Sequence, residues 1–362
     1  MDIVPQKILI IRLSAIGDVV RTLPALRALR SKFPSAYIAW IVEEGAQDLL
    51  QGHPDLNYLF VFKRKKWANE FFTLHNFLNP FREILDFFKK IRREDFDVVL
   101  DFHGIFKSGV IGFLSGVPLR VGFSRRYSKE CNYLFNNYHI ALETDVTSRI
   151  ERNLNFIRFL GVDCDDQEPI IPITNEDKNY IDNFFREKGL YTHIPLIAVH
   201  PGTSKKTAYK RWNVLHYATL ADKLIDRLHA KIIWTWGPGE LKIAEAIVEH
   251  MKHESIIACK TENLRQLAEI FCRCNLFLGS DSGPMHIASF VKTPVVAIYG
   301  PTDPVVNAPY EKNPHIMLRK DLPCSPCRNR KCESLQCMNM VKPDEVFDAV
   351  YRLLKTQNGI VI

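Results

Sequence analysis

The sequence has no long, uninterrupted apolar segment. Among its 362 residues, no run approaches the ~18 apolar residues that span a bilayer, and even the apolar start at residues 7–13 contains Arg12. The N-terminus also lacks the successive basic, apolar and small-residue regions of a secretory signal. We therefore expect a cytoplasmic protein without a membrane span.

A strong excess of one charge sign is also absent. The chain carries 48 Lys and Arg residues against 41 Asp and Glu residues, a formal net charge of +7, and neither half is a polybasic tail. Two basic clusters are present: residues 63–66, and Arg120 with Arg125, Arg126 and Lys129. Such clusters are either solvated faces or sites for an anionic ligand or membrane surface.

Short apolar runs rich in β-branched residues alternate with helical patterns along the chain. This alternation predicts an α/β fold, in which parallel sheets carry helices on both faces. A helical period is present over residues 19–32, and a last helix is expected over residues 343–354. The predicted strands are residues 7–13, 37–42, 58–62, 98–102, 119–123, 196–200, 231–236, 256–259, 276–279 and 295–299.

The strand–helix pattern runs in two blocks, as expected for a chain longer than the ~150 residues of one domain. Pro169 and Pro172 lie between the blocks and disfavour a helix there. We expect an N-terminal domain over residues 1–172, a C-terminal domain over residues 173–342, and a C-terminal helix within residues 343–362 that packs back toward the N-terminal domain.

The first strand is not followed by a dinucleotide-binding fingerprint. Gly17 is the single glycine where G-x-G-x-x-G would need three, which disfavours a nicotinamide-dependent oxidoreductase. Residues 14–18 instead end in Asp18 at the start of a helical pattern. Asp18 is either a helix N-cap or a carboxylate at a substrate crevice that acts as a general base. The residues alone leave both interpretations open.

Loops rich in small residues follow strands of the second block, at residues 200–204, 237–240 and 279–284. Small residues let a ligand approach the backbone, and Pro284 suits the first turn of a helix. Free N–H groups and the dipole at that helix start would bind a phosphate without a metal. Lys210 would add a mobile cation, and Glu240 would accept hydrogen bonds from ribose hydroxyls. The loops together predict a nucleotide site.

Residues 10–26, I-I-R-L-S-A-I-G-D-V-V-R-T-L-P-A-L, closely resemble the opening of glycosyltransferase family 9, the lipopolysaccharide heptosyltransferases. Other segments are similar to the family's further motifs and follow in the same order: residues 40–45, 101–104 with Lys107, 210–212, 280–283 with His286, and 299–304. Residues 40–45 and 63–67 look most like the enzyme that adds the first heptose. The His-Pro-Gly and Cys-rich segments look more like the one that adds the second.

The resemblance implies a GT-B fold, in which two Rossmann-like domains face each other across a cleft. The N-terminal domain would bind the acceptor and the C-terminal domain the nucleotide-sugar. It implies metal-independent, inverting transfer of heptose from ADP-heptose to the inner core of lipopolysaccharide, at Kdo-lipid A or at the first heptose, with no cofactor required. An anionic glycolipid acceptor implies peripheral contact with the cytoplasmic face of the inner membrane.

The resemblance also assigns roles by position. Asp18 matches the catalytic base of the family. His103 stands where the family usually has Gln, which leaves the acceptor contacts open and makes His103 a second candidate for the base. The matched donor contacts are Thr203, Ser204, Lys210, Glu240, Asp281, Ser282, Gly283 and His286. The matched acceptor contacts are Arg64, Lys66, His103, Lys107 and Arg120.

Four of the nine cysteines fall close together, as Cys324-x2-Cys327-x4-Cys332-x4-Cys337. The spacing fits a structural Zn²⁺ site of four thiolates, and free thiols are an equal alternative, whereas disulfides are disfavoured in a reducing compartment.

A zinc knuckle would make a nucleic-acid-binding protein the alternative function. The basic residues Arg328, Arg330 and Lys331 favour it, but no aromatic residue lies within the knuckle to stack on a base, so we expect no nucleic-acid partner. A GT-B-fold nucleotide-sugar epimerase is the other alternative.

Overall fold

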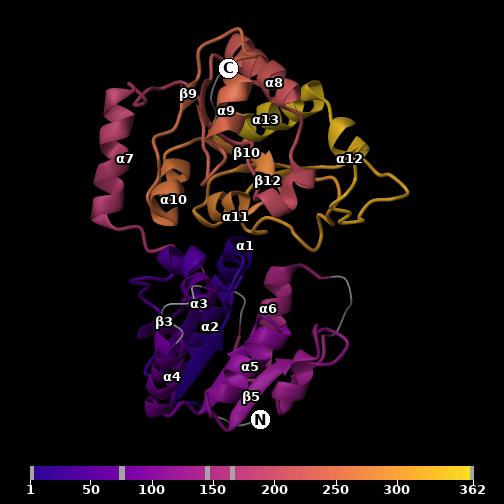
Figure 1. Ribbon diagram of the computed structural model, residues 1–362. Helices are drawn as coiled ribbons and strands as arrows, with labels where there is room; N and C mark the ends of the chain where they lie inside the picture. The colour runs from indigo at the N-terminus through magenta and orange to yellow at the C-terminus, as the bar shows by residue number, and fades with distance from the viewer. Residues whose placement is uncertain (1–3, 73–77, 143–146, 164–167, 359–362) are drawn as a thin grey trace. The chain divides into compact units, whose positions relative to one another are not determined.

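The computed structural model describes residues 4–72, 78–142, 147–163 and 168–358. The chain divides into two compact units, Met1–Pro172 and Ile173–Ile362. Figure 1 draws the first unit in indigo to magenta and the second in rose to yellow. Each unit is built on one six-stranded parallel sheet with helices packed against it.

The sheet of the first unit has the strand order β3-β2-β1-β4-β5-β6. Central β1 pairs with β2 on one side and β4 on the other, so that Ile8 lies opposite both Ile38 and Val98. Residues 8–11 are fully buried, as expected when helices cover both faces of a parallel sheet. The strands are β1 Lys7–Ile11, β2 Tyr37–Glu43, β3 Tyr58–Phe62, β4 Val98–Asp101, β5 Leu119–Phe123 and β6 Tyr138–Ile140.

The helical pattern over residues 19–32 forms two helices rather than one. Helix α1 ends at Val20, and α2 begins at Leu23 with Pro24 in its first turn, where the missing N–H costs nothing. Helix α6 packs against α2 (Figure 1), and α5 packs against the 3₁₀ helix η2. The helices are α1 Ile16–Val20, α2 Leu23–Lys32, η1 Glu44–Leu49, α3 Arg64–Phe72, α4 Leu78–Arg93, α5 Phe106–Leu114, η2 Asn132–Phe135 and α6 Arg149–Arg158.

The sheet of the second unit repeats the same topology, with the order β12-β11-β10-β7-β8-β9. Its first strand, β7, is again central and lies between β8 and β10. The strands are β7 Leu196–His200, β8 Lys231–Trp234, β9 Ile256–Ile257, β10 Leu276–Ser280, β11 Val295–Ile298 and β12 His315–Leu318. The helices are α7 Asn175–Glu187, η3 Lys205–Lys210, α8 Val214–Leu228, α9 Leu241–Val248, α10 Leu264–Cys272, α11 Gly283–Phe290, α12 Gln336–Asn339 and α13 Pro343–Asn358.

The last helix, α13, belongs to the core of the second unit. Val346, Val350 and Leu354 are buried with Leu224 of α8, and the helix also packs against β11 and β12. The apolar face of α13 is thus covered by the second unit, and the expected packing of residues 343–362 toward the N-terminal domain stays a prediction. Residues 359–362 lie outside the described part of the chain.

Both sheets confirm the predicted α/β class with two Rossmann-like units. All ten predicted strands are present, and two short edge strands, β6 and β12, were missed. In such sheets ligands bind beyond the carboxyl ends of the strands, where the strand order reverses. Those points are β1/β4 in the first unit and β7/β10 in the second. Among the described helices, none has the length and apolar character needed to cross a membrane.

Candidate active site

Asp18 lies just beyond the carboxyl end of β1, and three arginines surround its carboxylate. Arg12 Nη2 lies 2.8 Å from Asp18 Oδ2, Arg21 Nη2 lies 2.5 Å from Oδ1, and Arg149 Nη1 lies 2.6 Å from Oδ1. Asp18 is the third residue of α1. The N-cap residue of that helix is Ala15, and no side chain caps it. The N-cap interpretation of Asp18 is therefore wrong.

The arginines determine the protonation of Asp18. Burial by itself would raise the pKa of the carboxyl, but the charges of Arg12, Arg21 and Arg149 outweigh it and lower the pKa well below its usual value. Asp18 is therefore an ionised carboxylate throughout the physiological range. Three guanidiniums against one carboxylate leave the cluster with excess positive charge.

Helix α6 supplies Arg149 to this cluster from far along the chain. Asn153, one turn after Arg149 on the same face, donates from Nδ2 to the Arg21 carbonyl and the Thr22 hydroxyl, each at 3.0 Å. Phe156, a further turn along, packs on Phe102 at the end of β4. These contacts fix the start of α6 beside α1 and place Arg149 at Asp18.

A second ion cluster stands at the carboxyl end of β2. Glu43, the last residue of that strand, accepts a salt bridge from Lys107 Nζ and lies 3.1 Å from Arg64 Nε. The Glu43 side chain is 11% exposed, whereas that of Arg64 is 50% exposed. The cluster thus brings two of the predicted acceptor residues, Lys107 and Arg64, to the same edge of the sheet as Asp18.

His103 follows β4 and is held by the adjacent strand end. The Leu13 N–H donates to His103 Nδ1 at 3.2 Å, and Asp101 Oδ1 accepts from the His103 N–H at 3.0 Å. Burial and the charge of Arg12 lower the pKa of His103 to about 3, so the ring is neutral. A neutral ring that accepts at Nδ1 carries its proton on Nε2. His103 is therefore a hydrogen-bond donor at Nε2, like the amide of Gln, and not a proton acceptor there.

Two predicted acceptor residues lie elsewhere. Lys66 is two residues beyond Arg64 on α3 and so faces another side of that helix, where its Nζ lies 2.5 Å from Glu83 Oε1. Arg120 lies near the amino end of β5 and donates to the Phe135 and Val117 carbonyls at 2.9 and 2.8 Å. The structure does not bring either residue to the clusters around Asp18 and Glu43.

In the second unit, the partly buried Lys210 joins the buried Asp281 and His286 in one group beyond β7 and β10. Lys210 Nζ lies 2.8 Å from Asp281 Oδ2, and His286 Nε2 lies 3.8 Å from Asp281 Oδ1. Burial would raise the pKa of Asp281, but the nearby His286 ring and the Lys210 charge lower it far below its usual value. Asp281 is therefore ionised and holds the Lys210 ammonium in place.

Glu240 is the N-cap residue of α9 and contacts the end of β7 and the loop that follows β8. Its Oε2 accepts from the Gly237 N–H at 3.0 Å and lies 3.3 Å from His200 Nε2, while His200 Nδ1 lies 3.0 Å from the Thr235 hydroxyl. Burial by itself would raise the pKa of Glu240, but His200, the Gly237 N–H and the charge of Arg211 together outweigh it and lower the pKa. A Cβ on Gly202 would lie 2.3 Å from Glu240 Oε2, so this packing requires glycine at position 202.

The remaining predicted donor residues line the same loops. Helix α11 begins at Gly283, with Ser282 as its N-cap residue. Within the described chain, the buried Ser282 Oγ has no hydrogen-bond partner, which leaves it available to a ligand. The Thr203 hydroxyl donates to the Thr207 carbonyl at 2.9 Å, and the Ser204 hydroxyl lies 2.8 Å from that of Thr207. Thr203 and Ser204 thus shape the turn that leads to Lys210.

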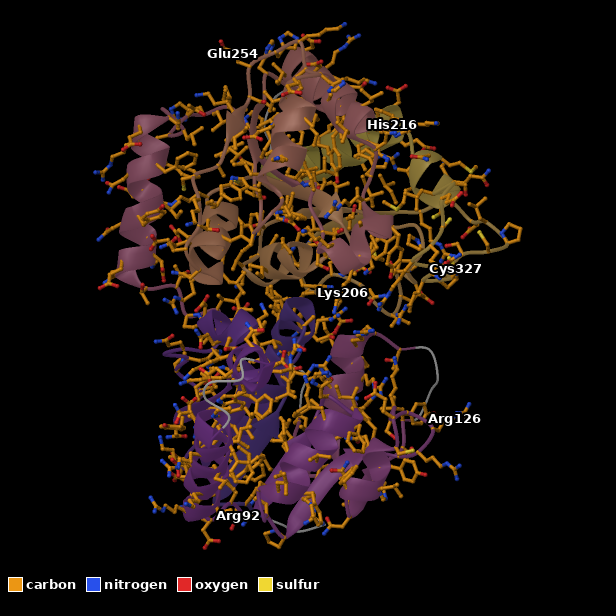
Figure 2. All side chains as sticks on the ribbon, viewed as in Figure 1. Arg92, Arg126, Lys206, His216, Glu254 and Cys327 are labelled. Atoms are coloured by element: carbon orange, nitrogen blue, oxygen red, sulfur yellow. The ribbon has the colours of Figure 1, made fainter. Side chains whose placement is uncertain are left out.

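The four clustered cysteines are free thiols. Among the residues that the structure describes, no three Cys, His, Asp or Glu side chains are placed to hold a metal ion, so the predicted tetrahedral site is not assembled in this arrangement. The segment instead packs on the loop after β11, where the Cys327 and Arg328 N–H groups donate to the Pro301 carbonyl at 3.1 and 3.0 Å. Figure 2 labels Cys327 in the loop that precedes α12.

Sequence reasoning missed several residues of these clusters. Arg12 and Arg21 lie inside the motif around Asp18, but nothing in the motif shows that they contact its carboxylate. Glu43 directly follows the predicted strand 37–42, and an acidic residue at such a strand end is a signal that could have identified it. Arg149 has no local signal because its partner Asp18 is 131 positions away.

The family model for glycosyltransferase family 9 (heptosyltransferase) matches residues 84–338. Among curated proteins, the chain is 27% identical over 312 residues to the lipopolysaccharide core heptosyltransferase OpsX of Haemophilus influenzae, covering 84% of this chain and 82% of the relative.

Among solved structures, a family 9 glycosyl transferase from Veillonella parvula superposes with a TM-score of 0.78 at 24% identity, covering 99% of both chains. The Escherichia coli heptosyltransferase WaaC, solved with ADP, superposes with a TM-score of 0.75 at 22% identity, covering 96% of this chain and 99% of that one. These likenesses establish the shared fold.

Proposed function

The chain belongs to glycosyltransferase family 9, the heptosyltransferases, and on that premise we propose that it transfers heptose from ADP-heptose to the inner core of lipopolysaccharide. The observation that carries the proposal is the Asp18 carboxylate, ionised among arginines at the carboxyl end of β1. Sugar transfer needs a carboxylate that can accept the proton of the acceptor hydroxyl. Both the OpsX protein of H. influenzae and the E. coli WaaC protein are named as heptosyltransferases, and WaaC was solved with ADP. These names support heptose as the sugar and ADP as the nucleotide.

The second unit is the proposed donor side. Lys210 and the N–H groups at the start of α11 would bind the diphosphate, and Ser282 Oγ would supply a further hydrogen bond. Glu240 would accept from the ribose hydroxyls, in an orientation held by His200. A bound diphosphate would compete with Asp281 for the Lys210 ammonium.

The first unit is the proposed acceptor side. Arg64 and Lys107, both held by Glu43, would contact the phosphate or carboxylate groups of an anionic acceptor. His103 would donate from Nε2 to an acceptor oxygen. Lys66 and Arg120 are not part of this proposal, because their side chains are engaged elsewhere.

The proposed reaction is a single displacement with inversion and without a metal ion. Asp18 accepts the proton of the acceptor hydroxyl as its oxygen bonds to the anomeric carbon, and the bond from that carbon to the diphosphate breaks. The leaving ADP takes the negative charge, which Lys210 and the start of α11 stabilise. Addition of EDTA should leave the rate unchanged, and NMR of the product should show the inverted anomer.

We also propose peripheral contact with the cytoplasmic face of the inner membrane, where a lipid-linked acceptor would lie. An aromatic–basic face made by α5 and η2 supports it. Phe106, Phe113 and Leu134 on this face are 50%, 55% and 68% exposed. Arg120 stacks over the Phe113 ring with its guanidinium 5.5 Å from the ring centroid, and Arg126 points away from the ribbon nearby (Figure 2). Exposed aromatics bordered by cations suit an anionic lipid interface.

The cysteine segment is proposed as a structural brace for the loop after β11. The family match extends to residue 338 and so includes the segment, which argues against a separate nucleic-acid-binding module. A structural zinc at these thiols is tested by metal analysis of the purified protein. One zinc per chain that is lost in C332S would establish it, and zinc-free protein of full activity would exclude it.

The proposed activity is tested by incubating the protein with ADP-heptose and Kdo-lipid A, or with the same acceptor already carrying one heptose. Mass spectrometry should show a gain of one heptose on one of the two acceptors, and UDP- and GDP-sugars should not replace ADP-heptose. No product with either acceptor would contradict the proposal. Interconversion of the donor without transfer would instead favour the epimerase alternative.

A further inference from the structure

The Asp18 cluster holds more positive charge than one carboxylate needs. The side chains of Arg12 and Arg21 are 10% and 6% exposed, so both are buried with Asp18, whereas that of Arg149 is 30% exposed. Arg152, on the same face of α6 as Arg149, adds a further cation, and its burial, together with the charges of Arg149 and Arg12, lowers its pKa to about 10. Burying several guanidiniums together is costly unless anions compensate them. The buried carboxyl of Asp101, at the end of β4, also acts on Arg12, but four guanidiniums still exceed two carboxyl groups. A bound anion would offset this excess of positive charge.

The same cluster is poorly suited to proton transfer as it stands. Asp18 Oδ1 accepts from Arg21 and Arg149, and Oδ2 accepts from Arg12. A carboxylate held by three cations has a strongly lowered pKa and is a weak base, whereas general-base catalysis is most efficient with a pKa near the working pH. Recovery of basicity therefore requires that at least one arginine leave the carboxylate.

We propose that Arg12, Arg149 and Arg152 form a subsite for an oxyanion of the acceptor, and that binding of this anion draws Arg149 away from Asp18 Oδ1. The proposal rests on the proposed function, in which Asp18 is the base. Arg149 is the mobile member because it is the most exposed of the three and reaches Asp18 from the first turn of α6. Arg21 and Arg12 remain and keep the carboxylate in position. Arg149 is thus a positioning residue that restrains Asp18 until the acceptor arrives.

The charges around Asp18 fix the sign of the expected pH effect. Arg12 after β1, Arg21 after α1 and Arg149 from α6 lower the pKa of Asp18. Arg152 of α6 is a further cation near it, Asp101 of β4 acts on the same Arg12, and His103 after β4 is neutral. Removing Arg149 and adding an anion both raise the pKa of Asp18. The acid limb of kcat, which reports the enzyme–substrate complex, should therefore lie at higher pH than the acid limb of kcat/KM for the acceptor, which reports the free enzyme.

The test compares wild type with R149Q in pH profiles at saturating ADP-heptose. If Arg149 has left Asp18 in the wild-type complex, R149Q should move the acid limb of kcat/KM to higher pH and leave the limb of kcat in place. The acceptor KM should rise at least tenfold, the effect of losing a charge-assisted contact. Inorganic phosphate and acetate, compared with chloride at equal ionic strength, should compete with the acceptor in wild type and less in R149Q. Stronger competition by phosphate or by acetate shows which oxyanion the subsite prefers.

The matched control is R158Q, on the exposed end of the same helix, where Arg158 pairs with Glu151. It should leave both limbs and the acceptor KM unchanged. If R149Q does not fold, R149K, which keeps the charge, should leave the kcat limb in place with a smaller rise in KM. If the acid limbs of kcat and kcat/KM move equally in R149Q, or if its acceptor KM is unchanged, the proposed movement of Arg149 away from Asp18 is wrong. Asp18 would still be the base. Full activity of D18N would instead contradict the proposed function itself.

Discussion

Lys210 Nζ lies 2.8 Å from Asp281 Oδ2, and the same ammonium lies 3.3 Å from the Asp281 carbonyl oxygen. The carboxylate thus holds a partly buried cation at the switch point of the second sheet, beside the start of α11. A ligand with a more negative charge than Asp281 would engage this ammonium. That relationship gives the donor side its first test.

K210A should lower kcat/KM for the nucleotide-sugar far more than it affects the acceptor KM. Loss of a charge-assisted contact to the leaving diphosphate should cost about 2–4 kcal/mol in the transition state. The control is K206A, because Lys206 is an exposed lysine in the same η3 turn (Figure 2). Equal kinetics for K210A and K206A would contradict the assignment.

G202A should weaken donor binding without removing any functional group. The added methyl carbon would lie 2.3 Å from Glu240 Oε2 and so displace the carboxylate. We expect a rise in the donor KM similar to that of E240Q, with little change in the acceptor KM. G239A would not serve as a control, because Gly239 has a positive φ of 80° and alanine would strain the backbone there. Gly45 has no positive φ and no atom within 4 Å of an added Cβ, so it is the suitable control. G45A should therefore leave the donor KM unchanged.

H103Q should remain active within a few-fold of wild type, because His103 acts as a donor at Nε2 and Gln keeps that ability. The substitution should also change acid stability. The pKa of His103 falls from its usual value near 6.5 to about 3 on folding, so between those values the unfolded chain binds a proton that the folded chain does not. The free energy of unfolding should therefore be unaffected by this residue above about pH 6.5 and should decrease as the pH falls below that value, because the proton stabilises the unfolded chain.

The measurement is the urea midpoint at pH 7 and pH 5 for both proteins. Wild type should lose more stability than H103Q over that interval. The reverse order would contradict the neutral, buried state of His103, and a loss of turnover in H103Q would restore it as a candidate base.

Binding to anionic vesicles should fall as salt is added, because cations of the first unit would contribute ~1 kcal/mol each near the surface. R126E should weaken vesicle binding at low salt, where the charge contact dominates. F113S should weaken the binding that persists at high salt, where the apolar contact dominates. K188E, an exposed site on the second unit, is the control. Binding that is independent of salt and of both substitutions would rule out the aromatic–basic face.

The strands were predictable because their physical signal is local. Residues 8–11 form an apolar run that is buried on both faces, and such runs read clearly in the sequence. Strands β6 and β12 were missed because they are short edge strands with partly exposed residues, so neither a buried run nor a clean alternation marks them. Pro24 could have predicted the break between α1 and α2, since proline favours the first turn of a new helix.

The functional clusters were predictable only in part. Motif position placed Asp18, Lys210, Glu240 and Asp281 at strand ends, because the carboxyl ends of parallel strands share one edge. It gave no information on side-chain direction, so Lys66 and Arg120 were grouped with Arg64 and Lys107 although their side chains pair elsewhere. The contact of Arg149 with Asp18 depends on how α6 packs beside α1, which one sequence does not show.

The central claim, that Asp18 is the catalytic base, is tested most directly by single-turnover rates of D18N at saturating donor and acceptor. Asn keeps the size of Asp but cannot accept the proton, so the rate should fall by roughly 10²–10⁴. A parallel titration should show nearly unchanged affinity for ADP-heptose, because Asp18 lies in the first unit and the proposed donor residues lie in the second. Turnover of D18N within about threefold of wild type would contradict the claim.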